Sequence, residues 1–262
     1  MTRRRLDAEL VRRGEARSRD HASELIAAGA VTVNGNVATK PATQVDDAAP
    51  IVVRAGDQGP VYVSRGAYKL IGALDAFAID PAGRDCLDAG ASTGGFTDVL
   101  LRRGASRVIA ADVGYGQLAW SISSDERVTV MDRCNLREVT SLPFAPDLVV
   151  ADLSFISLTL VLPALRRVAQ PDADFVLMVK PQFEVGRELV GSGGVVRDPQ
   201  HRAGAVAKVA AAAQDEGLGV RGVVASPLPG PSGNVEYFLW LHHTGAAPDQ
   251  RLIDQAVAEG PR

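Results

Sequence analysis

The sequence has only two cysteines, Cys86 and Cys134, among its 262 residues. Two isolated cysteines make neither a disulfide framework nor a zinc site, so we expect buried, reduced thiols in a reducing compartment. No apolar run approaches the length of about 18 residues that a transmembrane helix requires. The basic N-terminus does not lead into the apolar core of a signal peptide. These absences predict a soluble, cytoplasmic protein with no metal and no membrane partner.

A large net charge is also absent, because 28 basic and 31 acidic residues give -3 at pH 7. The distribution is uneven, however. Residues 1–20 contain seven arginines against four acidic residues, a local charge of +3 (7 − 4). Residues 61–262 contain 19 basic and 23 acidic residues, a net charge of −4 (19 − 23). A basic end on an acidic body predicts an anionic partner at that end, although a solvated helix face would give the same pattern.

The common nucleotide-binding fingerprints are missing from the stretch around which the chain is organised. Residues 85–113 read DCLDAGASTGGFTDVLLRRGASRVIAADV, which predicts a strand, a glycine turn, a helix and a second strand. The glycines at 90, 94 and 95 lack the G-x-G-x-x-G spacing, and no lysine follows them as in a P-loop. A nucleoside ligand without a pyrophosphate therefore fits best, which suggests S-adenosylmethionine. The alternative is a structural turn that binds no cofactor.

The predicted cofactor pocket lies where the strands of this unit end, since ligands of open α/β sheets bind there. Asp112 ends the second strand, where a carboxylate can accept hydrogen bonds from ribose hydroxyls. The residues predicted to bind the cofactor are Asp88, Gly90, Ser92, Gly94, Asp112, Asp132 and Asn135.

Residues 1–58 predict a separate module of two short helices and three strands, with an Asn34-Gly35 hairpin turn. The module has no convergent catalytic groups. Its sequence, RLDAELVRRGEARSRDHASELIAAGAVTVNGNVATKPATQV, resembles the α-L RNA-binding module first named from a ribosomal small-subunit protein. The resemblance implies that basic side chains contact folded RNA through its phosphates. The candidates are Arg4, Arg17, Arg19 and Lys40.

Residues 59–64 are predicted to form a linker, because Gly59 and Pro60 interrupt any regular structure. Residues 65–244 alternate apolar strands with helices, and a proline-rich return predicts that the last hairpin is antiparallel. This order predicts an α/β fold, the Rossmann-like seven-stranded sheet of S-adenosylmethionine-dependent methyltransferases, with a small N-terminal α+β RNA-binding module. The glycine-rich residues 186–199 could form a mobile lid, and residues 245–262 form a C-terminal tail.

Four charged residues are expected to converge at one edge of this sheet. Asp152 and Lys180 follow central strands, Glu236 begins the antiparallel last strand, and Lys69 lies on the helix before the first strand. Each residue alone is more typical of a structural role, but the set beside a cofactor turn predicts a catalytic site. A ribose hydroxyl needs a base, and a lysine can serve if burial or a like charge lowers its pKa. We expect Lys180 to be that base and Lys69 the like charge. Asp152 and Glu236 should orient the lysines without crowding Lys180.

The set resembles the K-D-K-E tetrad of ribose 2′-O-methyltransferases. The whole chain resembles the hemolysin/TlyA family of rRNA (cytidine-2′-O)-methyltransferases through SRGAYKL, LDAGASTGGFTDVLL, ADVGYGQLAW, DLVVADLSFISL, VKPQFEVG and SPLPGPSGNVEYFLWL. The resemblance implies S-adenosylmethionine-dependent 2′-O-methylation of cytidine in rRNA of ribosomal subunits, by a monomer and without a metal. The N-terminal residues and the tail match the longer subtype, which is associated with both 16S and 23S rRNA. Further predicted RNA-binding residues are Arg65, Tyr115 and Arg133.

Two other functions stay open at this point. A non-catalytic RNA-binding assembly factor could keep the fold without the reaction, although the intact charged set argues against it. A membrane-lytic protein is suggested only by the older name of the family. No strongly amphipathic basic helix supports that reading.

Overall fold

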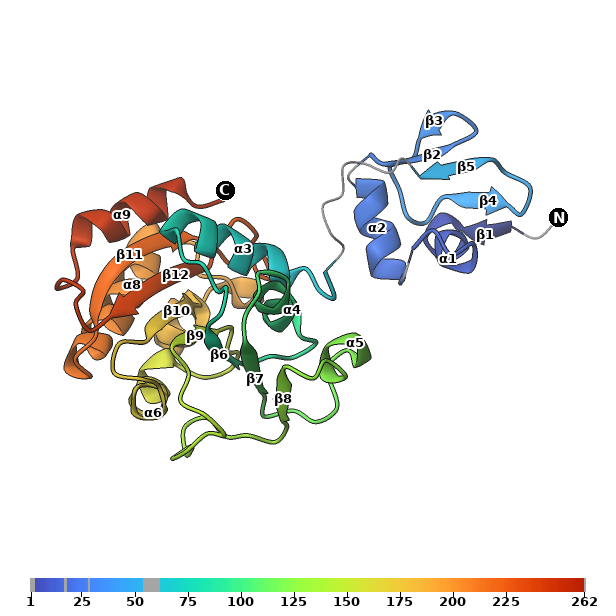
Figure 1. Ribbon diagram of the computed structural model, residues 1–262. Coiled ribbons are helices and arrows are strands. Elements are labelled where there is room, and N and C mark those ends of the chain that lie inside the picture. Colours follow the sequence, from blue (N-terminus) through green and yellow to red (C-terminus); the bar gives the residue numbers. More distant parts are fainter. Residues whose placement is uncertain (1–2, 17, 28, 54–61, 262) are drawn as a thin grey trace. The chain divides into compact units, whose positions relative to one another are not determined.

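The computed structural model describes residues 3–16, 18–27, 29–53 and 62–261. It divides into two compact units, Met1–Val61 and Tyr62–Arg262, which we call unit 1 and unit 2 (Figure 1). The first three residues of the predicted linker, 59–61, and the RNA-binding candidate Arg17 lie outside the described residues.

Unit 1 packs two helices against two small antiparallel sheets. In one sheet β1 (Arg3–Arg5) pairs with β4 (Gln44–Asp46), and in the other β2 (Val31–Val33) pairs with β3 (Asn36–Val37) and β5 (Ile51–Val53). The helices are α1 (Leu6–Arg12) and α2 (Arg19–Ala27). Asn34 and Gly35 have φ of +52° and +80°, the left-handed conformation that an Asn-Gly hairpin turn needs. The pairing of β1 with β4 was not predicted, because a run of arginines carries no apolar strand pattern.

Unit 2 contains the predicted seven-stranded sheet, in the order β11-β12-β10-β9-β6-β7-β8. In this sheet β12 runs antiparallel to both of its neighbours, β10 and β11, and the other described pairs are parallel, which confirms the predicted antiparallel last hairpin. The bounds are β6 Asp85–Ala89, β7 Arg107–Ala111, β8 Val128–Met131, β9 Leu148–Ala151, β10 Asp174–Val179, β11 Gly219–Ala225 and β12 Tyr237–His242.

Helices cover both faces of this sheet (Figure 1). On β9 the buried Leu148 and Val150 point to one face and Val149 and Ala151 to the other, as expected for a central strand with two buried faces. One face is covered by α3 (Gly66–Phe77), α4 (Gly95–Arg102) and α5 (Trp120–Ser123). The other is covered by α6 (Leu162–Val168), α8 (Pro199–Asp215) and α9 (Gln250–Glu259). A 3-10 turn, η1 (Leu158–Leu160), precedes α6.

The order of the strands reverses between β6 and β9, since the chain moves from β6 outward to β8 and then returns to β9 on the other side. In open α/β sheets such a switch point leaves a crevice at the carboxyl ends of the strands. The fold therefore directs a ligand to the segments that follow β6, β7, β8 and β9.

The glycine-rich segment 186–199 contains two short 3-10 turns, η2 (Arg187–Leu189) and η3 (Ser192–Gly194). The buried Asn234 fastens it to the turn before β12. Its Oδ1 accepts a hydrogen bond from Val196 N at 2.9 Å, and its Nδ2 donates to Gly194 O at 2.8 Å. Opening of this segment as a lid stays a prediction.

Among the residues that the structure describes, no helix is long and apolar enough to cross a membrane. The same residues contain no group of three or more histidine, cysteine, aspartate or glutamate side chains placed to hold a metal ion.

Candidate active site

The turn after β6 lies directly against the segment after β9. Gly90 has a φ of +90°, and a Cβ at this position would stand 2.8 Å from Asp152 O. Only glycine avoids both the strained backbone and this clash. Ser92 follows with a φ of +48°, and its N–H donates to Asp112 Oδ2 at 2.8 Å. The glycine turn is therefore tied to the ends of both β9 and β7.

A cavity of about 400 Å³ opens at this edge of the sheet. Gly90, Ser92, Asp112 and Asn135 line it, as do Asp152 and residues that the sequence did not single out. Gln117, Cys134, Leu136, Ile156 and Val161 are among these. The apolar ones, Leu136, Ile156 and Val161, were missed because isolated apolar residues after strands look like ordinary core in a sequence.

Three predicted cofactor residues do not line this cavity. Gly94 directly precedes α4, and a Cβ there would meet Leu118 and Ile122 rather than open space. Asp132 Oδ2 accepts a hydrogen bond from Gly116 N at 3.0 Å, and it thereby shapes the turn after β7. Asp88 is completely buried beneath the glycine turn. The part that these three residues play in cofactor binding stays a prediction.

Asp112 is held in position by two backbone amides. Its Oδ1 accepts from Gly114 N at 2.7 Å, and its Oδ2 accepts from Ser92 N at 2.8 Å. A carboxylate has about four acceptor sites, so Asp112 can still accept hydrogen bonds from two ribose hydroxyls. The cavity is acidic at Asp112 and Asp152 and apolar at Leu136 and Ile156. Its size is that of a small-molecule site, and its lining fits a positively charged nucleoside such as S-adenosylmethionine.

The buried carboxyl group of Asp88 has a hydrogen-bond partner on one of its oxygens only, within the described residues. Thr97 Oγ1 donates to its Oδ2 at 2.7 Å, while Oδ1 has no hydrogen-bond partner in the described part of the chain. Burial raises the pKa of Asp88 to about 7, and the charges of Asp152 and Asp112 add to this effect against the Thr97 hydrogen bond. The carboxyl group of Asp88 therefore keeps its proton to a higher pH than an ordinary aspartate does.

This buried acid predicts a pH-dependent stability. The ordinary pKa is 3.8 and the folded one about 7, so the folded state binds the extra proton between these values. The free energy of unfolding should therefore fall as the pH rises from about 4 to about 7, by roughly 4 kcal/mol at most. Chemical denaturation of the Asp88→Asn variant should show that this decline is gone. The exposed Asp172→Asn is the matched control and should keep the wild-type profile; equal slopes in all three proteins would refute the assignment.

The four charged residues lie at one edge of the sheet as two ion pairs. Lys69 Nζ lies 2.5 Å from Glu236 Oε2, and both side chains are buried. Lys180 Nζ lies 2.6 Å from Asp152 Oδ1 and donates to Ser154 Oγ at 2.8 Å. Val179 of β10 faces Tyr237 of β12, so the register, continued by one residue, sets Lys180 opposite Glu236.

This pairing differs in two respects from the expected arrangement. Glu236 compensates the charge of Lys69, which therefore is not a free cation acting on Lys180. Asp152 stands closer to Lys180 than the sequence analysis allowed. Asp152 and Ser154, the two partners of Lys180, both line the cavity. The catalytic roles of the set stay a prediction, but both partners of Lys180 line the cavity.

Glu184, which the sequence analysis did not select, ties together two segments of the site. It ends α7 (Pro181–Glu184), directly after Lys180, and it is buried. Ser157 Oγ donates to it at 2.5 Å and Leu158 N at 2.7 Å. Burial raises the pKa of Glu184, while these hydrogen bonds and the charge of Lys208 oppose the rise. Glu184 thereby fixes the loop that carries Ser154 relative to Lys180.

The aromatic side chain of Phe155 stands almost fully exposed at the mouth of the cavity. Its φ of +65° is unusual for a bulky residue, and its ring lies 5.3 Å from that of Phe183. Such a conformation costs free energy, which the fixed loop must offset. The result is an apolar ring beside Ser154.

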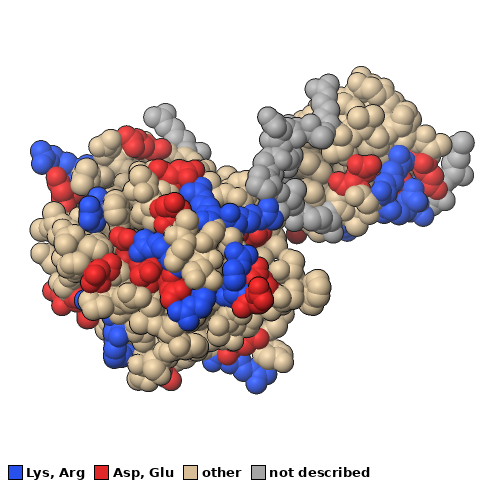
Figure 2. Space-filling model, in the orientation of Figure 1, with Lys and Arg blue, Asp and Glu red and all other residues tan. Residues whose placement is uncertain are grey.

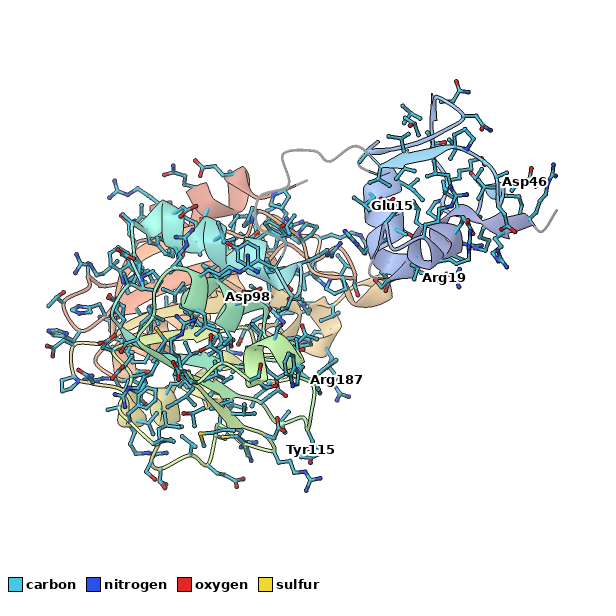
Figure 3. All side chains as sticks on the ribbon, turned by 45° about the vertical axis from the view of Figure 1, so that its right-hand side comes forward. Glu15, Arg19, Asp46, Asp98, Tyr115 and Arg187 are labelled. Atoms are coloured by element: carbon cyan, nitrogen blue, oxygen red, sulfur yellow. The ribbon has the colours of Figure 1, made fainter. Side chains whose placement is uncertain are left out.

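Basic residues of unit 1 form ion pairs with carboxylates, of which Asp7 is buried and Asp47 is exposed. Arg19 NH2 lies 3.0 Å from Asp7 Oδ2, and Arg4 NH1 lies 2.7 Å from Asp47 Oδ1 (Arg19 is labelled in Figure 3). Hydrogen bonds from Arg5 and Arg19 hold the pKa of Asp7 well below its usual range. Figure 2 shows basic and acidic side chains next to each other on this unit. The buried Asp7 therefore orients Arg19, whereas Asp47, the partner of Arg4, is exposed, as is Lys40.

Two RNA-binding candidates of unit 2 are in contact beyond the ends of β7 and β8. The guanidinium of Arg133 lies 4.5 Å from the centre of the Tyr115 ring, and Tyr115 is largely exposed. Arg65 is exposed before α3. Whether these residues contact RNA stays a prediction.

Comparisons with known proteins give a consistent result. Residues 62–243 match the FtsJ-like methyltransferase family and residues 4–49 match the S4 domain. The chain is 60% identical over 264 residues to the Mycobacterium tuberculosis 16S/23S rRNA (cytidine-2′-O)-methyltransferase TlyA, covering 98% of each chain. It is 37% identical to Hemolysin A of Brachyspira hyodysenteriae, covering 89% of this chain and 97% of that protein. A solved structure from Streptococcus thermophilus, named as a hemolysin, has a TM-score of 0.77 at 36% identity and covers 99% of this chain and 96% of its own.

Proposed function

The chain belongs to the hemolysin/TlyA family of rRNA (cytidine-2′-O)-methyltransferases, and on that premise we propose that it methylates the 2′-hydroxyl of cytidine in rRNA with S-adenosylmethionine. The observation that supports this reaction best is the position of Lys180. Both of its partners, Asp152 and Ser154, line the cavity that fits the cofactor. A basic side chain and an electrophile would thus meet at one edge of the sheet.

Five residues that line the cavity would hold the cofactor. Asp112 would accept hydrogen bonds from the ribose, and Asn135 would lie beside the adenine with Leu136 and Ile156 as apolar walls. Gly90 would let the ligand approach the backbone closely. When bound, S-adenosylmethionine supplies an electrophilic methyl group on a positively charged sulfur.

The proton of the ribose hydroxyl would pass to Lys180. For this step Lys180 must present the lone pair of its neutral amine to the hydroxyl, within hydrogen-bond reach. Asp152 then compensates the ammonium that results, at the 2.6 Å separation seen here. Ser154 and Asp152 also limit the directions that Nζ can take. The buried Lys69–Glu236 pair would hold the neighbouring strand end in place.

The RNA would be held by both units. In unit 1 Arg19, oriented by Asp7, and Arg4, paired with Asp47, would present planar donors to phosphates. In unit 2 the exposed ring of Phe155 offers a stacking surface next to Ser154. We propose that the protein acts as a monomer on ribosomal subunits. We also propose that both 16S and 23S rRNA are substrates, because the similarity to the relative named for both extends over 98% of the chain.

Methyl transfer from labelled S-adenosylmethionine to separately purified small and large subunits tests this proposal. The subunits should come from cells that lack the modification. We expect label in both subunits, in nucleosides that prove to be 2′-O-methylcytidine after complete digestion. Label in one subunit alone would contradict the dual specificity. No label in either, with cofactor binding intact, would favour a non-catalytic assembly factor.

A further inference from the structure

An exposed apolar edge follows β7 and is not used by the reaction described above. It consists of Val113, Tyr115 and Trp120, whose side chains are 77%, 70% and 82% exposed. We call these three residues the aromatic edge. Large apolar side chains gathered on one short segment, and left in water, indicate a binding surface. Tyr115 lies at the edge of unit 2 in Figure 3.

The exposure does not come from a loose loop, because the backbone of this segment is fixed at several points. Gly114 N donates to Asp112 Oδ1 at 2.7 Å, and Gly116 N donates to Asp132 Oδ2 at 3.0 Å. Ala119 N, next to Trp120, donates to Thr93 O of the glycine turn at 3.1 Å. The segment is therefore built on the same groups that shape the cofactor cavity, and it holds its aromatic rings outward at a defined place.

The location and the neighbouring charge indicate what the aromatic edge would bind. Val113 itself lines the cofactor cavity, so the edge begins at the site of methyl transfer. The guanidinium of Arg133 lies 4.5 Å from the centre of the Tyr115 ring. Aromatic rings combined with a guanidinium bind single-stranded nucleic acid, because the rings stack on bases and the guanidinium binds the phosphate backbone of the nucleic acid.

We propose that Trp120 stacks on an unpaired base of the rRNA that flanks the target nucleotide, and that Asp132 is a positioning residue for this surface rather than a cofactor ligand. The inference rests on the proposed function, because it takes the RNA to enter at the cofactor cavity. It adds a contact that neither the charged set nor the basic residues of unit 1 supply. Asp132 acts by holding Gly116 and thus the ring of Tyr115.

The two tryptophans of the chain allow a direct binding test. Trp240 Nε1 donates to Asp174 Oδ1 at 2.7 Å, and its ring packs between Phe77 and Arg221. In a Trp240→Phe variant the fluorescence therefore reports on Trp120 alone. We expect a single-stranded oligocytidylate to quench it, and S-adenosylmethionine alone to leave it nearly unchanged. An Asp132→Asn change in this background should weaken the affinity for the oligonucleotide but not for the cofactor.

Methylation kinetics on ribosomal subunits complete the test. Trp120→Ala should raise KM for the subunits about 5- to 150-fold, the range of one lost base stack, with kcat nearly unchanged. Trp120→Phe should restore most of the affinity, because phenylalanine keeps a stacking ring. Leu252→Ala, at another exposed apolar side chain on α9, is the matched control and should behave like wild type.

Two results would overturn the inference while leaving the proposed function standing. The first is a wild-type KM for Trp120→Ala in an enzyme that methylates rRNA normally. The second is a change in Trp120 fluorescence on removal of residues 1–61 without any RNA, which would show that unit 1 covers the ring. If the wild-type protein transfers no methyl group, the proposed function fails. The fluorescence of Trp120 still tests the binding surface in that case, because quenching by the oligocytidylate does not require methyl transfer.

Discussion

Replacement of Lys180 by alanine is expected to reduce methyl transfer by about 10²- to 10⁴-fold, the usual contribution of a general base. Cofactor affinity should stay within a few-fold of wild type, because Lys180 does not line the cavity and the residues that do are unchanged. The partner left behind, Asp152, is partly exposed, so the variant should still fold. Loss of transfer with retained cofactor binding is measured by labelled methyl incorporation beside a cofactor titration.

The chain offers a matched control, because it contains another lysine close to the site. Lys208 Nζ donates to Glu184 O at 2.7 Å and takes no part in the charged set. Lys208→Ala should therefore keep most of the activity. The pH profile adds a second readout, since a base that must be deprotonated gives a rate that rises with pH until the amine is neutral. Full activity of Lys180→Ala would exclude the proposed role.

Removal of residues 1–61 is expected to weaken binding to ribosomal subunits by about 100-fold or more, with cofactor affinity unchanged. Unit 2 should fold without unit 1, because both of its apolar cores consist of residues from Tyr62–Arg262 alone. Unit 1 supplies Arg19, which is paired with the buried Asp7, and Arg4, which is paired with the exposed Asp47. Equilibrium binding of full-length and shortened protein to purified subunits measures the difference, and equal affinity would refute an RNA-binding role for unit 1.

Substitution of three basic residues tests individual phosphate contacts while the rest of unit 1 stays in place. In a variant with Arg4, Arg19 and Lys40 all replaced by alanine, the logarithm of the binding constant should depend less steeply on salt. The slope should fall by about 2 if each side chain contacts one phosphate of single-stranded RNA. Replacing the surface residues Arg166, Arg221 and Arg251 of unit 2 serves as the control for net charge. An unchanged slope in the first variant would place the RNA contacts elsewhere.

The sequence by itself determined the order of strands and helices in unit 2 and the gathering of the charged residues at one edge. This was possible because short local patterns, such as apolar runs and glycine spacings, predict strands and turns. Parallel strands also bring their carboxyl ends together whatever the side chains between them. The positions of Asp112, Asp152 and Lys180 followed from these local signals alone.

The tertiary structure decided which of these groups are partners. Lys69 pairs with Glu236 across 167 positions of sequence, and Lys180 takes Asp152 and Ser154. It also decided which ordinary apolar residues line the cavity and that Trp120 stands in water. A sequence cannot show these features, because ion pairing and burial depend on distances between segments that only the packed sheet brings together.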